Sequence, residues 1–395
     1  MEPHLKYRWV ILALAWLLFG TLFLFWYNMP TIAPRIMEMY SIDQTMYSLV
    51  FTLPWLLAGL LAFPAGIFAD RVGVRTAATV GGFIAALGTF VRTLPGVEML
   101  LLSQALLGFG VGMVLVNLPK AINAWFPPQQ VGLATGIYLT SMMIFISVGM
   151  VIAPYFPSWE SMNLTGAIVI LIATLLFAAF VKNAPPGTVI PKPPVIEGAK
   201  VALSSKAIWG AALGTFVAMM GMVPWQALFA TAAFIEKGIP LAIGGAIVSL
   251  ITNPGWVGSF VFPMMSSKTG KVRVYIAGLS IAFSALMLAA WFNSNLNMLW
   301  VLVGLAGFVA GGVIPHWMAV PAYLPFVENK MKPEYIGGAS GVLNTFLCIG
   351  AFISTPFIIA PIASASGFTI AFIVASIFFA IQGLFAILIP EPPKA

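Results

Sequence analysis

Long apolar runs separated by short polar segments fill most of this chain of 395 residues. A hydrocarbon core about 30 Å thick needs roughly 20 apolar residues per helix, and twelve segments of the chain qualify. They are residues 9–29, 44–64, 75–94, 98–123, 131–155, 163–181, 206–233, 241–264, 273–292, 297–325, 336–360 and 367–389. The alternating pattern of a membrane β-barrel is absent, so the runs predict an all-α integral membrane protein with twelve transmembrane helices.

The positively charged residues predict how these helices cross the membrane. With a cytoplasmic N-terminus, fifteen of the 18 Lys and Arg residues fall in cytoplasmic segments, and only Arg35, Arg92 and Lys237 fall outside. Because cytoplasmic loops are enriched in Lys and Arg, we expect both termini in the cytoplasm and a multi-pass protein of the cell membrane. The first run lacks a small-residue cleavage site, so we expect it to be retained as the first span.

Composition excludes several classes of protein. A mean hydropathy of +1.02 is too high for a soluble domain. The net charge of +7 comes from short clusters rather than a continuous basic face, so no nucleic-acid partner is expected. A single cysteine, Cys348, rules out a disulfide framework and a cysteine metal site. With no phosphate-loop pattern and no cluster of catalytic residues, we expect neither an ATP-driven pump nor an enzyme, and no cofactor.

The two halves of the chain resemble each other across a polar central segment. The stretch 182–206 is rich in Pro, Gly and Lys and falls between the sixth and seventh runs, which is typical of a linker. We therefore expect an N-terminal six-helix bundle (1–182), a cytoplasmic linker (183–205) and a C-terminal six-helix bundle (206–395).

Two pairs of segments carry the internal similarity. "DRVGVR" (70–75) follows the second run, and "SKTGKVR" (267–273) follows the eighth, with Gly73 aligned to Gly270. "VGLATGIYLT" (131–140) likewise resembles "IGGASGVLNT" (336–345). A repeat of six plus six helices is a known transporter architecture.

The loop between the second and third runs resembles a motif of the major facilitator superfamily. That family carries the pattern Gly-x-x-x-Asp-Arg-x-Gly-Arg there, and the corresponding residues of this chain are Gly66, Asp70, Arg71, Gly73 and Arg75. With twelve spans and a central linker, the resemblance covers nearly the whole chain. It implies a secondary transporter that works by alternating access between two halves.

The resemblance also implies that this motif is a cytoplasmic gate. In the family, the aspartate meets the positive N-terminal end of a helix in the other part of the bundle. Asp70 lies at the C-terminal end of its helix, where the helix dipole disfavours an anion, so it needs a partner. We expect Gly73 to permit a tight turn and Gly66 a close helix approach. The alternative, that these are ordinary interfacial charges, explains the arginines but not Asp70, whose counterpart Ser267 is uncharged.

Departures from family patterns bear on the substrate. Gln104 stands where many proton-coupled members place an Arg, and "GMVIAP" (149–154) matches a drug-efflux pattern only in part. "NAWFPPQQVGLATGI" (123–137) resembles the corresponding turn of nitrate/nitrite, cyanate and monocarboxylate carriers, although Gln130 and Val131 replace the Glu-Arg often found there.

Polar side chains within the spans define the expected substrate cavity, because such groups are costly in lipid. They are Asn28, Asn117, Lys120, Tyr138, Trp225, Gln226, Asn253, His316 and Asn344. Amide and aromatic groups suit an uncharged or singly charged small solute. Each of them has the alternative role of a hydrogen bond between helices, and Lys120 that of reaching to the headgroups.

His316 is the candidate for proton coupling because an imidazole titrates near neutral pH. Pro315 and Pro321 beside it predict a broken or kinked helix. The alternative is a neutral histidine bonded between helices. Together with Lys120 and Arg35, the sequence favours a small monovalent anion as the substrate, H⁺ as the candidate coupling ion, and a monomer in the bilayer. The alternatives are export of hydrophobic or drug-like compounds and facilitated passage of a neutral solute.

Overall fold

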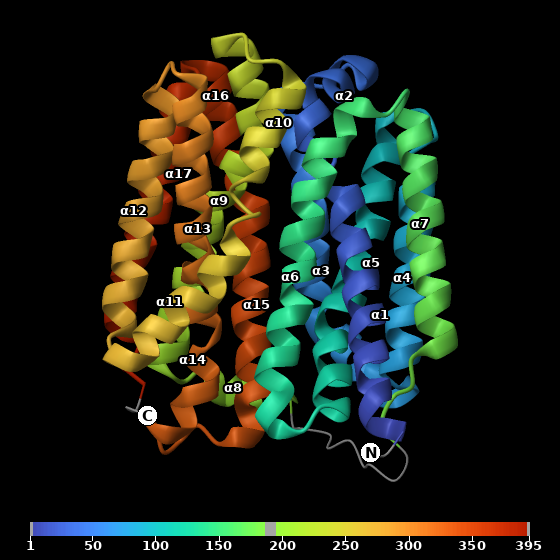
Figure 1. The fold of residues 1–395 in the computed structure, drawn as a ribbon, viewed down its shortest axis with the longest axis vertical. Helices are drawn as coiled ribbons and strands as arrows, with labels where there is room; N and C mark the ends of the chain where they lie inside the picture. Colours follow the sequence, from blue (N-terminus) through green and yellow to red (C-terminus); the bar gives the residue numbers. More distant parts are fainter. Residues whose placement is uncertain (1–2, 186–194, 393–395) are drawn as a thin grey trace. The chain divides into compact units, whose positions relative to one another are not determined.

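The computed structural model describes residues 3–185 and 195–392, and every regular element within these two ranges is a helix (Figure 1). Residues 186–194 of the expected linker lie outside the described residues. Eleven helical segments of the described chain are long and apolar enough to cross a membrane. This confirms the all-α membrane fold and most of the expected spans.

The helices group into two compact units. The first comprises Met1–Met29 and Leu53–Lys192, and the second comprises Pro30–Thr52 and Pro193–Ala395. The first contains α1 (Pro3–Trp26), most of α3 (Gln44–Val72), α4 (Val74–Val91), α5 (Val97–Trp125), α6 (Pro128–Ile152) and α7 (Trp159–Phe180). The second contains α2 (Ala33–Tyr40), α8 (Val195–Ala202), α9 (Lys206–Lys237), α10 (Leu241–Ser249), α11 (Gly255–Thr269), α12 (Val272–Phe292), α13 (Leu296–Met318), α14 (Val320–Tyr323), α15 (Ile336–Ser354), α16 (Ala360–Ser366) and α17 (Phe368–Ile381).

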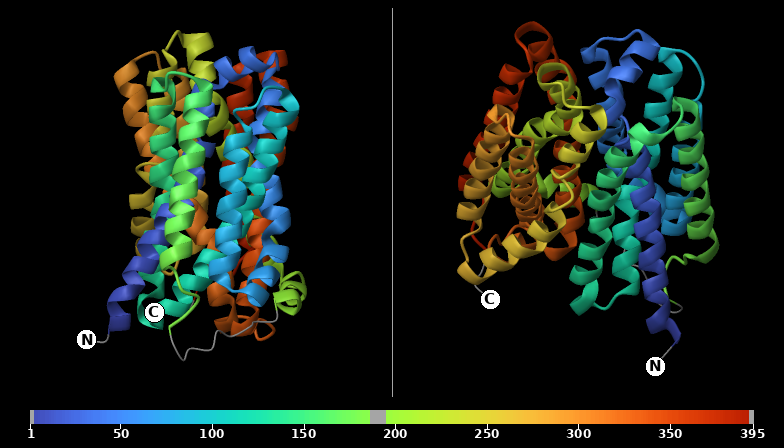
Figure 2. Two further views of the ribbon diagram at one scale, coloured as in Figure 1. Left: turned by 90° about the vertical axis from the view of Figure 1, so that its right-hand side faces the viewer. Right: turned by 45° about the horizontal axis from the view of Figure 1, so that its top comes forward.

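The same helix pairings occur within each unit. In the first, α1 packs against α6 and α7, and α4 packs against α5 and α7 (Figures 1 and 2). In the second, α9 packs against α15 and α17, and α12 packs against α13 and α17. The paired helices occupy the same places in the order of each half, which confirms two copies of a six-helix repeat.

A glycine with positive φ makes the turn between the second and third helices of each repeat. Gly73 has a φ of 88° and Gly270 a φ of 67°. Side chains of L-residues disfavour this region. A Cβ at Gly73 would also lie 2.5 Å from the amide nitrogen of Asn183. The two glycines that the sequence aligns therefore serve the same turn.

Other glycines bring the second and fourth helices of each repeat into backbone contact. A Cβ at Gly108 on α5 would lie 2.6 Å from the Cα of Pro54 on α3. A Cβ at Gly311 on α13 would lie 1.9 Å from the carbonyl oxygen of Gly255 on α11. Gly66 differs, because a Cβ there would meet its nearest atoms at ordinary distances of 3.6 and 3.7 Å. The lack of a side chain at Gly66 is not what brings its helix close to α5.

The eighth expected span is two helices rather than one. α10 ends at Ser249 and α11 begins at Gly255, and the link between them contains Asn253 and Pro254 (Figure 1). Pro254 has no N–H, and its ring disfavours helical backbone at the residue before it. The apolar character of the whole segment hides this break from a hydropathy pattern.

The tenth span is interrupted once, after its first proline. α13 continues through Pro315 to Met318, and the helix resumes as α14 at Val320. Pro321 lies in the first turn of α14, where a missing N–H costs nothing. Of the two prolines expected to break the helix, only Pro321 adjoins an interruption.

An arginine at the start of the third helix fastens the end of the sixth segment in each repeat. Arg75 Nε donates to the carbonyl oxygen of Ala178 at 2.7 Å. Arg273 Nε donates to the carbonyl oxygen of Ile389, also at 2.7 Å. The last carbonyls of a helix have no partner within it, and these guanidinium groups satisfy them.

An aromatic residue completes the same arrangement from the fourth segment of each repeat. Trp125 Nε1 donates to the carbonyl oxygen of Lys182 at 3.0 Å. The Tyr323 hydroxyl donates to the carbonyl oxygen of Pro390 at 3.1 Å. We call Arg75 with Trp125 the first clasp, and Arg273 with Tyr323 the second clasp. Each clasp lies entirely within its own unit.

Replacement of Arg75 by Ala is expected to loosen the C-terminal end of α7, because its last carbonyls lose a charged donor. A loss of about 1 kcal/mol corresponds to roughly fivefold faster hydrogen exchange there. Exchange of residues 176–183, followed by mass spectrometry, measures this. Arg71→Ala, in the same motif and exposed, is the matched control and should leave exchange unchanged. Equal exchange in the two variants would contradict the role of the clasp.

Candidate functional site

The expected cavity residues are divided between the two units, and each set is described within its own unit. Asn28, Asn117, Lys120 and Tyr138 belong to the first. The second contains Trp225, Gln226, Asn253, His316 and Asn344.

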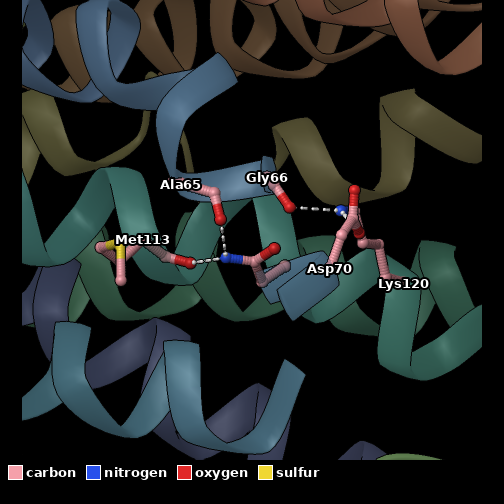
Figure 3. A network of polar contacts seen from close by, with 6 residues as sticks. Ala65, Gly66, Asp70, Met113 and Lys120 are labelled. Atoms are coloured by element: carbon pink, nitrogen blue, oxygen red, sulfur yellow. Dashed lines mark hydrogen bonds and ion pairs between the residues drawn. The ribbon is translucent and has the colours of Figure 1, made fainter. Parts of the chain in front are cut away.

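Lys120 and Asp70 form an ion pair within the first unit (Figure 3). Lys120 Nζ on α5 lies 2.6 Å from Asp70 Oδ1 in the last turn of α3, and it also donates to the carbonyl oxygen of Gly66 at 3.0 Å. The two side chains are 24% and 26% exposed. The ammonium group supplies the positive charge that a carboxylate at a helix C-terminus requires.

Asn117 makes a second polar connection between the same two helices, one turn along α5 (Figure 3). Its Nδ2 donates to the carbonyl oxygen of Ala65 at 3.2 Å and to that of Met113 at 2.8 Å. It is fully buried. α3 and α5 are thus joined by an amide and by an ion pair, so this end of the first unit is held by directional contacts as well as by packing.

These contacts change how two of the expected residues are interpreted. The charge of Lys120 is neutralised by Asp70, so this lysine is not an isolated cation awaiting an anion. Asp70, expected to face the other half, has a partner within its own half. Sequence reasoning could not pair them because 50 positions separate them along the chain.

One face of α1 carries an aromatic cluster that sequence reasoning missed. Phe19, Phe23 and Trp26 recur at helical spacing, with ring centroids 5.0 and 5.4 Å apart along the row. Tyr138 of α6 stacks on Phe19 at 4.6 Å, and Trp55 of α3 packs on Trp26 at 4.9 Å. We call these five residues the aromatic face. Abundant phenylalanine throughout the chain hides such a row from a composition-based search.

Three polar groups on or beside the aromatic face are buried and have no hydrogen-bond partner. They are the Tyr138 hydroxyl, the Trp55 indole N–H and both ends of the Asn28 side-chain amide. Tyr138 and Asn28 are 0% and 1% exposed, and Trp55 is 6% exposed. Buried polar groups are almost always paired, so these three are available to a bound molecule or to water.

Arg92 forms a buried polar cluster in the first unit. Expected as a cation in an external segment, it instead caps α4 and is fully buried. Its guanidinium donates to the carbonyl oxygen of Phe25 and to Gln104 Oε1, each at 2.7 Å, and to Asn163 Oδ1 at 3.4 Å. Trp159 Nε1 in turn donates to its carbonyl oxygen at 2.9 Å. The cluster ties α1, α4, α5 and α7 together.

The Arg92 cluster also explains the glutamine at position 104. Where many proton-coupled members carry an Arg, this chain has a fully buried Gln104 that accepts a hydrogen bond from Arg92. The positive charge thus enters the same region from α4 instead of α5. A buried glutamine on one span and an arginine at the end of the neighbouring span are the sequence signal for this arrangement.

His316 lies buried in the second unit with both ring nitrogens engaged. Its Nε2 is 2.8 Å from the Ser266 hydroxyl on α11, and its Nδ1 faces the carbonyl oxygen of Gly312 one turn earlier on α13. Tyr275 of α12 stacks on the ring, with centroids 6.0 Å apart. His316 is 3% exposed. It joins the second and fourth helices of its half, as Asn117 does in the first.

The other expected residues of the second unit are more scattered. Trp225 is fully buried and stacks on Phe372 at 4.0 Å, and its indole N–H has no hydrogen-bond partner. Gln226, beside it, is also buried, whereas Asn344 is half-buried. Asn253 lies in the link between α10 and α11 and is exposed. In residues 3–185 and 195–392, no three His, Cys, Asp or Glu side chains are placed to hold a metal ion.

Comparison with known proteins agrees with this architecture. The hexuronate transporter of Bacillus subtilis (strain 168) is 23% identical over 366 residues, which cover 87% of this chain and 85% of that protein. The cyanate transport protein CynX of Escherichia coli (strain K12) is 22% identical over 77% of each chain. The solved structure of a bacterial homologue of the human lysosomal transporter Spinster, inward-facing and occupied, has a TM-score of 0.77 at 15% identity, covering 98% of this chain and 97% of that chain.

A family model described as Major Facilitator Superfamily matches residues 14–355. The match spans both repeats and includes the turn at Gly73, the Asp70–Lys120 pair and His316. This chain therefore belongs to the Major Facilitator Superfamily of membrane transporters.

Proposed function

We propose that this transporter carries a small monovalent anion, organic or inorganic. The observation that carries the proposal is the group of buried donors without partners, Tyr138, Trp55 and Asn28, beside the aromatic face. A small anion accepts several hydrogen bonds at once, and neutral donors held in a preorganised site can stabilise a single negative charge. Aromatic walls suit a small or planar organic group on the same molecule.

Two further observations support an anion. Relatives of this chain include a transporter named for hexuronate and one named for cyanate, both of which are anions. The turn at residues 123–137 resembles that of anion-carrying branches of the family. A neutral solute or a hydrophobic drug would also use the aromatic face, but neither would require three unpaired polar groups beside it.

Transport is proposed to proceed by alternating access between two halves, residues 1–182 and 206–395, joined by the linker 183–205. The repeated helix pairings, the Arg92 cluster and the two clasps each join helices of one unit, and they support movement of each half as a body. The transporter is placed in the cell membrane as a monomer.

The motif Gly66, Asp70, Arg71, Gly73 and Arg75 is proposed as part of the cytoplasmic gate, with Lys120 as an added member. The Asp70–Lys120 pair holds the end of α3 on α5. Opening of this end would separate two charges that are three-quarters buried, which is costly unless water reaches both. The pair therefore favours the closed arrangement of this end.

Proton coupling is proposed to use His316. It is the one of the chain's two histidines that lies in a predicted span, and its ring is buried between α11 and α13. An imidazole buried between helices can change charge in the physiological pH range, and a change of charge there alters how the two helices are joined.

Small monovalent anions are expected to raise the melting temperature of the purified transporter, whereas sugars, amino acids and hydrophobic cations are not. Tyr138→Phe removes one donor and should weaken anion binding about tenfold. Tyr155→Phe is the matched control, because Tyr155 is 75% exposed. Stabilisation by neutral or cationic ligands alone would contradict the anion proposal and favour one of the two alternatives.

His316→Gln is expected to impair proton-driven uptake and to leave counterflow of the substrate intact, because glutamine keeps hydrogen bonding but cannot carry the proton. Uptake into proteoliposomes with and without a pH gradient, compared with counterflow at equal pH, measures the two activities. His4→Gln provides the control. A proton dependence equal to that of the wild type would rule out His316 as the coupling group.

Asp70→Asn is expected to make the cytoplasmic end of α3 more accessible by leaving Lys120 without its charged partner. The readout is the alkylation rate of a cysteine placed at the buried Ala69 in a Cys348→Ser background. Exchange of the two charges, Asp70→Lys with Lys120→Asp, should bring the rate back towards that of the wild type. Equal labelling of all three forms would show that the pair does not hold this end closed.

A further inference from the structure

We infer that the Ser266 hydroxyl positions His316 in both protonation states of the imidazole, so that the two residues together form one proton-binding unit. The inference rests on the proposed role of His316 in proton coupling. Ser266 and His316 come from different helices, α11 and α13, and are 2% and 3% exposed. Their Oγ and Nε2 atoms lie 2.8 Å apart.

The contact at Nδ1 decides which nitrogen of neutral His316 carries the hydrogen. Nδ1 faces the carbonyl oxygen of Gly312, and a carbonyl oxygen can only accept a hydrogen bond. Nδ1 is therefore the protonated nitrogen, and Nε2 of the neutral ring has only a lone pair. In this state the Ser266 hydroxyl donates its hydrogen to Nε2.

A second acceptor lies within reach of the same hydroxyl. The carbonyl oxygen of Pro263, one turn earlier on α11, is 3.0 Å from Ser266 Oγ. A serine has one hydrogen to donate, so it cannot serve Nε2 and Pro263 at once. Proton binding at Nε2 resolves this competition, because Nε2–H then donates to Oγ while the hydroxyl hydrogen turns to Pro263. One proton is taken up, and the hydroxyl hydrogen only changes direction.

Every donor of the unit is satisfied in the protonated state. Nδ1–H bonds to Gly312, Nε2–H to Ser266, and the hydroxyl to Pro263. Hydrogen bonds to a charged group contribute more than bonds between neutral groups, so Ser266 stabilises the imidazolium more than the neutral ring. The side chain thus assists proton uptake at a site that burial alone would keep neutral.

No second titrating group is needed to explain a charge change at this place. Within the described part of the chain, the groups in hydrogen-bond or ring contact with His316 are Ser266, Gly312 and Tyr275. Of these three, only the phenol of Tyr275 on α12 is titratable, and a phenol stays neutral across the range in which an imidazole titrates.

The first half shows the same connection without the capacity to titrate. Asn117 bonds to the carbonyl oxygen of Met113, four residues earlier on α5, and to Ala65 on α3. His316 bonds to Gly312, four residues earlier on α13, and to Ser266 on α11. The repeat therefore places an amide in one half and an imidazole in the other. The proton-binding unit belongs to the second half alone.

The test reads the imidazole directly. The chain has two histidines, His4 and His316, so His4→Gln leaves a single ¹⁵N-labelled ring signal for NMR in lipid nanodiscs. Ser266→Ala is expected to move the midpoint of this titration to lower pH by about one unit. Ser266→Thr, which keeps the hydroxyl, should restore it. Ser267→Ala is the matched control, because the Ser267 hydroxyl is exposed and bonds only to its own helix at Met264.

Two results would overturn the inference. One is a titration midpoint in Ser266→Ala equal to that of Ser267→Ala in folded protein. The other is a ¹⁵N shift showing that the neutral ring carries its hydrogen on Nε2. The transport readout separates this inference from the proposed coupling role. If Ser266→Ala moves the titration while His316→Gln keeps full proton dependence of uptake, the proton-binding unit stands and the coupling role of His316 is lost.

Discussion

The structure depends on one constraint, which is that polar groups within an apolar layer must find partners inside the chain. Helices satisfy most backbone groups locally, and the exceptions are the ends and interruptions of helices. At these places the side chains of this protein do the bonding. Arg75 and Arg273 take the last carbonyls of the sixth segments, and Arg92 takes a carbonyl near the end of α1. Most of the charged chemistry of the molecule follows from where helices stop.

The same constraint makes the groups that lack partners informative. In a region where an unpaired donor costs roughly 1–3 kcal/mol, Tyr138, Trp55 and Asn28 are unlike the many threonines and serines that bond back to their own helices. Their place beside the aromatic face gives the first half the character of a recognition surface. The second half contributes the group that can change charge. Duplication has thus kept the helix pairings and allowed the chemistry of the two halves to diverge.

Much of the fold could be predicted from sequence because one physical signal, apolar length, specifies a membrane helix. The twelve runs, the repeat and the turn at Gly73 all come from local patterns. The link at Asn253 and Pro254 escaped because apolar residues surround it, although Pro254 and Gly255 are its local cause. Hydropathy measures cost of transfer and is insensitive to the conformation of a short segment.

The candidate site could be predicted less well, since it is made by contacts between distant positions. Tyr138, Asn28 and His316 are recognisable as polar residues in apolar surroundings. Trp55 and Phe19 are not, because an aromatic residue is ordinary in a span. The burial of Arg92 and the pairing of Lys120 with Asp70 depend on which helices adjoin, and a single sequence does not specify that for side chains 50 or more positions apart.

The clasps have a consequence for the origin of the chain. Each repeat fastens its own sixth segment with its own arginine and aromatic residue, and neither clasp uses a residue from the other half. A polypeptide of one repeat would already have had the means to close its bundle before any fusion took place. Gene duplication then needed to add only a connecting segment, and the joined copies were free to specialise, one in an amide at Asn117 and the other in an imidazole at His316.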